Sequence, residues 1–348
     1  MDTICFKNIS SHGRYVRKIP IKEGMSTLQR IEKLELTTNF PIGPVNSYVV
    51  FGEKLTLIDA GLKNKQGWDD LNHGLHRIGI ELTDLEQIVL THHHNDHTGL
   101  VDWILEKNPG IKIFAHKDTE MMLKDESYLE WSSEFFYNLF MESGLTKDMA
   151  IQSAFRKGHR DYFQIATVDK VLKEGDTVPG LPSFQVIETL GHSQDHISFY
   201  CADEQQFICG DHIIKGVHGG MFLDAPKPGS ERAKPLMQYL SNLEKCRKLP
   251  ANYTFSGHGP IISNLNEAID GHLSNIEKRV SRVINTLKKV NGAATGFEII
   301  QDMYRGRYEK AVITFLFEII SVLDLLEERN IIITEKQNGV FKYRLVNN

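Results

Sequence analysis

Short apolar runs separated by turn residues dominate the beginning of the chain. Residues 47–51 and 55–58 form two such runs, and Gly61 behind the second favours a turn. A helix is predicted next, because apolar residues recur at three- and four-residue spacing at Trp68, Leu71, Leu75 and Ile78. Residues 88–90 then form a buried strand that runs into a cluster of histidines. This order predicts an α/β unit with the cluster at a strand end, where functional sites are commonly built.

The pattern changes to helical spacing over about residues 116–161, which we interpret as a helical insert. Its apolar face is rich in aromatic residues: Tyr128, Leu129, Trp131, Phe135, Phe136, Leu139 and Phe140. One interpretation is that this face packs the inserted helices against the core. The other is that the insert is a lid whose aromatic side chains line a substrate pocket. The two interpretations are compatible.

Strand-like runs return in the second half of the chain, at residues 183–187, 196–200 and 206–209. Beyond residue 260 the spacing is helical again, with an amphipathic stripe at Leu265, Ile269, Leu273, Ile276, Val280, Val283 and Leu287. Residues 292–296 are predicted to be a linker. Two helices and a hairpin turned by an Asn-Gly pair follow, with strands at 331–334 and 340–345. Helices followed by a terminal hairpin are typical of a winged helix.

Composition narrows the class of protein. The chain has 348 residues, 41% hydrophobic and 24% charged, which is enough for one large core and a smaller second domain. A net charge of -5 provides no overall basic field for nucleic acid. The four cysteines form no CxxC pair, and we expect free thiols. Without an apolar leader or a membrane-spanning run, we expect a cytoplasmic protein with no membrane partner.

A dense group of metal-ligand residues occupies the segment Thr-His-His-His-Asn-Asp-His, residues 91–97. The alternation of His92 and His94 places two imidazoles on one side of an extended loop, and Asp96 and His97 can turn to a second ion. Three more candidates each stand beside glycine: His192, Asp211 and His258. Imidazole and carboxylate suit zinc without any thiolate. The sequence therefore predicts a metal centre assembled from four separate segments.

The segments THHHNDHTG, TLGHSQDH, ICGDH and FSGHGP resemble the motifs of the metallo-β-lactamase superfamily over roughly residues 36–260. The resemblance implies an α/β fold of the four-layer αβ/βα type, with two sheets face to face and helices outside. It also implies a catalytic domain at 1–263, carrying the insert, and a winged-helix-like domain at 264–348. An end of this kind, after GHGP, is similar to the β-lactamase-like protein 2 branch.

The resemblance further implies a ligand set for two divalent ions: His92, His94 and His192 for the first, Asp96, His97 and His258 for the second, and Asp211 as the bridge. We expect Zn²⁺, and Mn²⁺ or Fe²⁺ also fit these ligands. Asp59 resembles the carboxylate that orients a ligand histidine in the family. His93, His196 and His212 match no ligand position, and we interpret them as structural or outer-sphere residues.

Two ions of this kind activate water, so no protein nucleophile is needed. We assign catalytic roles to Asp211 and to Asp96, which can handle the proton. The favoured substrate is a small-molecule ester, thioester or lactone. Candidate substrate contacts are Arg156, Arg160, Lys215 and His218.

An RNA or DNA endonuclease of the β-lactamase-like protein 2 type is the alternative, and a non-catalytic metalloprotein is a third. Against a nuclease, the candidate recognition helix at 310–328 is apolar almost all round, whereas a nucleic-acid helix would carry Lys and Arg. Such a surface favours packing against the catalytic domain or a homodimer.

Overall fold

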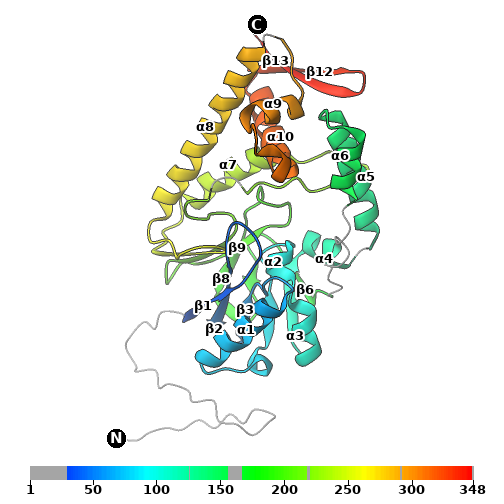
Figure 1. Cartoon of the computed structure of the whole chain (residues 1–348). Helices are drawn as coiled ribbons and strands as arrows, with labels where there is room; N and C mark the ends of the chain where they lie inside the picture. Colours follow the sequence, from blue (N-terminus) through cyan, green and yellow to red (C-terminus); the bar gives the residue numbers. More distant parts are fainter. Residues whose placement is uncertain (1–29, 125, 156–166, 218–219, 291, 347–348) are drawn as a thin grey trace, which may run out of the picture.

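The computed structural model describes residues 30–124, 126–155, 167–217, 220–290 and 292–346. Within them the chain folds into two β-sheets with helices on both outer faces, and a group of helices with a hairpin at the C-terminal end (Figure 1). The α/β fold class predicted from the sequence is confirmed.

The first sheet has the spatial order β1-β2-β3-β4-β5-β6 among the described residues. Its strands are β1 (Ile31–Leu36), β2 (Val45–Phe51), β3 (Leu55–Ile58), β4 (Gln87–Val89), β5 (Lys112–His116) and β6 (Lys170–Leu172). The pairs from β1 to β3 are antiparallel, and those from β3 to β6 are parallel. The parallel part has strands buried on both faces, which explains the uninterrupted apolar run before the histidine cluster.

The second sheet has the order β11-β10-β9-β8-β7. Its strands are β7 (Thr177–Val178), β8 (Leu181–Glu188), β9 (Ile197–Cys201), β10 (Gln206–Gly210) and β11 (Tyr253–Ser256). Only the pair of β10 and β11 is parallel among these described strands. The helix α7 (Pro235–Cys246) makes the crossover between those two strands, as a parallel pair requires.

Three hydrophobic clusters define the layers. One cluster joins the outer face of the first sheet to α1 (Lys65–Arg77) and α3 (Val101–Lys107), whose indoles Trp68 and Trp103 pack edge to face. A second lies between the sheets and includes Tyr48, Phe184 and Phe199. A third covers the other face of the second sheet with α7 and the C-terminal helices. The sequence of helix, sheet, sheet and helix is the four-layer sandwich that the resemblance implied.

The predicted insert consists of α4 (Lys117–Lys124), α5 (Glu126–Glu142) and α6 (Lys147–Ala154) among the described residues. Its aromatic face divides between two environments. Phe136 and Phe140 pack against Phe317, with ring centroids 5.5 and 6.2 Å away, in the third cluster. Tyr128 and Trp131 form a separate edge-to-face pair nearer the start of α5. The packing interpretation therefore holds for the later half of α5.

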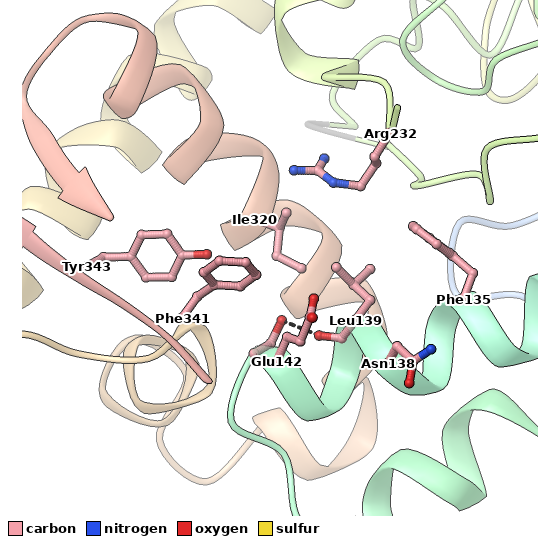
Figure 2. Close-up of a pocket in the computed structure, with 9 residues that line it drawn as sticks. Phe135, Asn138, Leu139, Glu142, Arg232, Ile320, Phe341 and Tyr343 are labelled. Carbon is pink, nitrogen blue, oxygen red and sulfur yellow. Dashed lines mark hydrogen bonds between the residues drawn. The ribbon is translucent and has the colours of Figure 1, made fainter. Parts of the chain in front are cut away.

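A cavity of about 310 Å³ separates part of α5 from the C-terminal elements (Figure 2). Phe135 and Leu139 line it from α5, and Ile320 and Phe341 line it from the C-terminal side. Arg232 reaches its edge and forms a two-pronged ion pair with Asp324, at 2.8 and 2.6 Å. This ion pair provides acceptors for the N–H groups of the partly buried Arg232 guanidinium.

The C-terminal elements are α8 (Leu265–Val290), α9 (Gly296–Met303), α10 (Val312–Glu328), β12 (Ile332–Gln337) and β13 (Val340–Leu345). The predicted helices and terminal hairpin are therefore present. Most of α10 is buried, from Leu316 to Leu326, so the chain itself covers the apolar surface that suggested a homodimer. The predicted linker joins α8 to α9, and its second half makes defined contacts. Ala294 pairs with Tyr343 through both backbone groups, and Thr295 caps α9.

The structure bears on two further expectations, one about the state of the cysteines and one about membrane-spanning helices. Cys201, Cys209 and Cys246 are buried free thiols, as expected, and Cys5 lies outside the described residues. Among the helices in the described ranges, none combines the length and apolar character needed to cross a membrane.

Candidate metal centre

The ligand-type side chains come from loops that follow strand ends. The loop after β4 supplies His92 and His94, and the short helix α2 (Asn95–Thr98) supplies Asp96 and His97. The second sheet supplies the others after β8, β10 and β11: His192, Asp211 and His258. Both sheets direct these ends to the same region, so residues up to 166 positions apart in numbering converge.

Three imidazoles form the first group. His92 Nε2 lies 2.9 Å from His94 Nδ1 and 3.2 Å from His192 Nε2, and His192 Nε2 lies 3.0 Å from His94 Nδ1. Ligands about 2.0–2.1 Å from a tetrahedral zinc ion are about 3.3 Å apart. The spacing of the three nitrogens is close to that of ligands around one ion.

The second group contains Asp96, His97 and His258. His258 Nε2 lies 3.3 Å from Asp96 Oδ2, and His97 Nε2 lies 4.0 Å from Asp96 Oδ1. Asp211 stands between the two groups, with its oxygens 3.4 Å from His97, 3.6 Å from His258 and 3.7 Å from His192. A carboxylate with two oxygens in this place can contact both ions.

The protonation of these side chains also suits a metal. Burial and the surrounding imidazoles hold the pKa of His92 and His94 well below the usual histidine value. Both rings are therefore neutral and keep a lone pair for an ion. Burial disfavours the charge of Asp211, yet the neighbouring histidines keep its pKa below its ordinary value, so it is a carboxylate.

Among the buried polar atoms of the described residues that have no hydrogen-bond partner, His97 Nε2 and Asp211 Oδ1 face each other in this centre, 3.4 Å apart. Buried polar atoms of this kind need an explanation, because leaving them unpaired costs free energy. A divalent cation would satisfy both atoms. The residues present therefore fit a divalent metal centre, and this fit rests on donor type, spacing and unpaired atoms together.

Asp59 orients His97 of the second group. Its carboxylate accepts hydrogen bonds from His97 Nδ1 at 2.7 Å, and from the Thr91 amide and hydroxyl at 2.8 and 2.9 Å. The bond to His97 leaves Nε2 directed at the site. His258 is oriented in the same way, by a contact of 2.8 Å between its Nδ1 and the Pro44 carbonyl.

The sequence model of the Metallo-beta-lactamase superfamily matches residues 41–258, the range that contains every ligand-type residue described above. The chain belongs to the metallo-β-lactamase superfamily. Its fold agrees: a metallo-beta-lactamase family protein from Thermus thermophilus superposes with a TM-score of 0.72 at 21% identity, covering 90% of this chain and 98% of that one.

Relatives of this superfamily member carry hydrolase names. Probable metallo-hydrolase YqjP of Bacillus subtilis (strain 168) is 29% identical, covering 86% of this chain and 93% of that protein. The Beta-lactamase-like protein 2 homolog of Caenorhabditis elegans is 25% identical, with 76% and 72% covered. The Atrochrysone carboxyl ACP thioesterase of Aspergillus fumigatus is 24% identical, with 74% and 68% covered. The chain is therefore an enzyme of the hydrolase type.

Glycine allows the close approach of ligands in this metallo-β-lactamase site. A Cβ on Gly257 would lie 2.0 Å from Asp211 Oδ1, which leaves no space for any other residue. Gly210 has φ +49°, and a Cβ there would lie 2.7 Å from His196 Nε2. The glycines beside the ligand motifs thus let the backbone pass directly behind the site.

The three histidines outside the ligand set have identifiable surroundings. His196 Nδ1 contacts the Thr189 hydroxyl at 2.7 Å, and its Nε2 accepts from the Asp211 amide at 3.1 Å, so it supports that residue. His212 is buried beside the ring of Tyr239. For His93, burial favours the neutral ring, but Asp195 and Asp224 raise its pKa to about 9. Both ring nitrogens of His93 face carboxylates, with Nδ1 2.9 Å from Asp195 and Nε2 3.7 Å from Asp224.

Sequence reasoning missed the carboxylates Asp195 and Asp224 that face His93. One signal was available for Asp195, which lies inside the motif TLGHSQDH, three residues after the ligand-type His192. For Asp224 no motif pointed to the contact. The segment carrying Asp224 also places Phe222 against the site, with its ring centroid 4.8 Å from that of His94.

The predicted substrate contacts remain predictions. Arg156, Arg160 and His218 lie outside the described residues. Lys215 is exposed in the turn after β10. For Tyr128 of the insert, burial and the carboxylates of Asp224 and Asp195 raise the pKa well above the usual value.

Proposed function

We propose that this chain is a dinuclear metal-dependent hydrolase that cleaves an ester, thioester or lactone of a small molecule. The observation that carries the proposal is Asp211, placed between two groups of ligand-type side chains and within 3.7 Å of members of both. His92, His94 and His192 would hold one ion. Asp96, His97 and His258 would hold the other. Zn²⁺ is the favoured ion, with Mn²⁺ and Fe²⁺ as alternatives.

When bound, two divalent ions supply an oxygen nucleophile at neutral pH and a positive charge that polarises the electrophile. The residues of the chain position these groups and move the proton. Asp96 is buried, with one oxygen toward His258 and the other toward His97, where it can hold a proton and release it to a leaving group. Asp59 keeps His97 in one orientation throughout, because three hydrogen bonds fix its carboxylate.

The preference for a small molecule rests on the C-terminal elements and on a relative. The part of α10 from Leu316 to Leu326 is buried, so this apolar stretch is not available to a nucleic-acid groove. A relative at 24% identity is named a thioesterase, which supports thioester or ester cleavage here. The site itself is compatible with any of the three bonds, because each presents a polarisable carbonyl.

RNA or DNA endonuclease activity is the second candidate. The observation in its favour is the 25% identity to the Beta-lactamase-like protein 2 homolog. The same two ions can cleave a phosphodiester by in-line displacement.

A panel of substrates separates the two candidates. Protein purified without chelator would be assayed with a p-nitrophenyl ester, an acyl thioester, a lactone, bis(p-nitrophenyl) phosphate and single-stranded RNA. We expect kcat/KM to be highest for one of the three carbonyl substrates. Cleavage of RNA or of the phosphodiester as the fastest reaction would replace the proposal by the alternative.

The two ends of α5 should differ in their effect on activity. Tyr128→Ala should lower kcat/KM by roughly 10- to 200-fold for the preferred substrate alone, the range for one lost wall contact. Phe140→Ala, in a fully packed site, should lower the free energy of unfolding by about 3–5 kcal/mol and slow all substrates equally. Kinetics on two unrelated esters, thermal melts and metal content would be compared. An equal loss of kcat/KM for both esters in Tyr128→Ala would show that Tyr128 supports the fold and does not contact the substrate.

A further inference from the structure

Asp195 is a fully buried carboxylate on which three segments of the chain converge. Its Oδ1 accepts hydrogen bonds from the Ser193 hydroxyl at 2.7 Å and from His93 Nδ1 at 2.9 Å. Its Oδ2 accepts a hydrogen bond from the Thr119 hydroxyl at 2.6 Å. His93 belongs to the loop after β4, Ser193 to the loop after β8, and Thr119 to α4 of the insert.

Each of the two loop residues is the immediate neighbour of a ligand-type histidine. His93 precedes His94, and Ser193 follows His192. These two ligand-type nitrogens are 3.0 Å apart. Asp195 therefore joins the side chains of both ligand loops through hydrogen bonds, and the hydroxyl of Thr119 ties the insert to the same carboxylate.

Asp224 extends the cluster but does not turn it into a third metal site. Its Oδ2 accepts a hydrogen bond from the Gln194 amide at 2.6 Å, and its Oδ1 lies 3.7 Å from His93 Nε2. Both oxygens of Asp195 already accept hydrogen bonds from hydroxyl groups, those of Ser193 and Thr119. Hydrogen bonds account for this cluster without any ion.

We propose that Asp195 is a positioning residue that couples the order of the insert to metal loading, an inference that rests on the proposed function through its two-ion centre. An ion held by His94 and His192 fixes both loops and so fixes the donors of Asp195. The oriented carboxylate then holds Thr119, and with it the start of α4. The insert also carries Tyr128, so its order affects the part of the chain that we propose to contact the substrate.

Hydrogen–deuterium exchange tests the coupling without any assay of activity. Metal-free protein would be compared with protein at saturating Zn²⁺. We expect zinc to slow exchange in α4 and α5 of the wild-type chain, although neither helix supplies a ligand. Thr119→Val, which removes only the link to the insert, should lose this zinc-dependent protection. Thr119→Ser, which keeps the hydroxyl, should retain it.

Asp195→Asn tests the other direction of the coupling. Loss of the charged acceptor should weaken zinc binding by roughly 10- to 100-fold, as loss of a carboxylate behind metal ligands typically does. A competing chromogenic chelator would measure this affinity. Thr146→Val is the matched control, because its hydroxyl accepts only from the Met149 amide within the insert. It should lower the melting temperature while zinc-dependent protection of α4 and α5 persists.

The outcomes distinguish the inference from the proposed function. Equal zinc-dependent protection in Thr119→Val and wild type, or unchanged zinc affinity in Asp195→Asn, would overturn the coupling alone. Failure of the wild-type chain to bind zinc, manganese or iron at all would overturn the metal centre and the hydrolase proposal with it.

Discussion

Replacing Asp211 by alanine is expected to lower kcat/KM by roughly 100- to 1,000-fold while the fold stays intact. Asp211 directly follows β10 and its carboxylate faces the imidazoles of His97, His192 and His258, so its removal takes no apolar side chain from the core. Its loss takes away the one carboxylate within reach of both ligand groups. The second ion should then bind more weakly. Steady-state kinetics with elemental analysis of the same protein would measure both effects.

The control for this variant is Asp169→Ala. Asp169 accepts from Lys112 Nζ at 2.8 Å and from the Ile113 amide at 2.9 Å at the surface, with no contact to the centre. It should retain two ions and full activity. Wild-type activity and metal content in Asp211→Ala would show that this carboxylate does not bridge the ions.

Removing the metal is expected to abolish activity and to lower the melting temperature by several degrees. Each ion that binds only the folded chain, at 1,000 times its dissociation constant, adds about 4 kcal/mol of stability. Stripping it also exposes His97 Nε2 and Asp211 Oδ1 as unpaired buried atoms. Dialysis against a chelator, then titration with Zn²⁺, Mn²⁺ or Fe²⁺ under calorimetry, would follow activity and stability together.

The same titration measures stoichiometry. Two ions per chain are expected, because His92, His94 and His192 form one group and Asp96, His97 and His258 another. Recovery of full activity at one ion per chain, with no second binding step at saturating metal, would contradict the dinuclear centre.

Local patterning was sufficient to predict much of the fold. β2, β3 and β4 appear where short apolar runs stand between turn residues, and α8 follows the stripe that begins at Leu265. These elements bury one face or both, so their periodicity is visible in the sequence. β1 (Ile31–Leu36) was not predicted, because it is an edge strand with alternating charged residues and only its pairing with β2 makes it a strand.

The metal-ligand motifs could be recognised because each lies within a few residues of a strand end, and three of the ligand-type residues, His192, Asp211 and His258, directly follow glycine. The spacing of His92 and His94, and the positions of His192, Asp211 and His258, pointed to one centre before any distance was known. The residues that hydrogen-bond beside the ligands could not be predicted in the same way. His93 and Asp195 are 102 positions apart, and no local pattern connects them.

The sequence by itself determined which residues can bind an ion and which segments bury apolar side chains, because ligand chemistry and hydrophobic periodicity are local properties. Only the tertiary structure decided that Phe136 and Phe140 pack with Phe317 while Tyr128 packs edge to face with Trp131. Only the tertiary structure placed the Thr119 hydroxyl on Asp195. Such contacts join segments distant in the chain. Their formation depends on how the sheets and helices stack, and the packing of the whole core sets that arrangement.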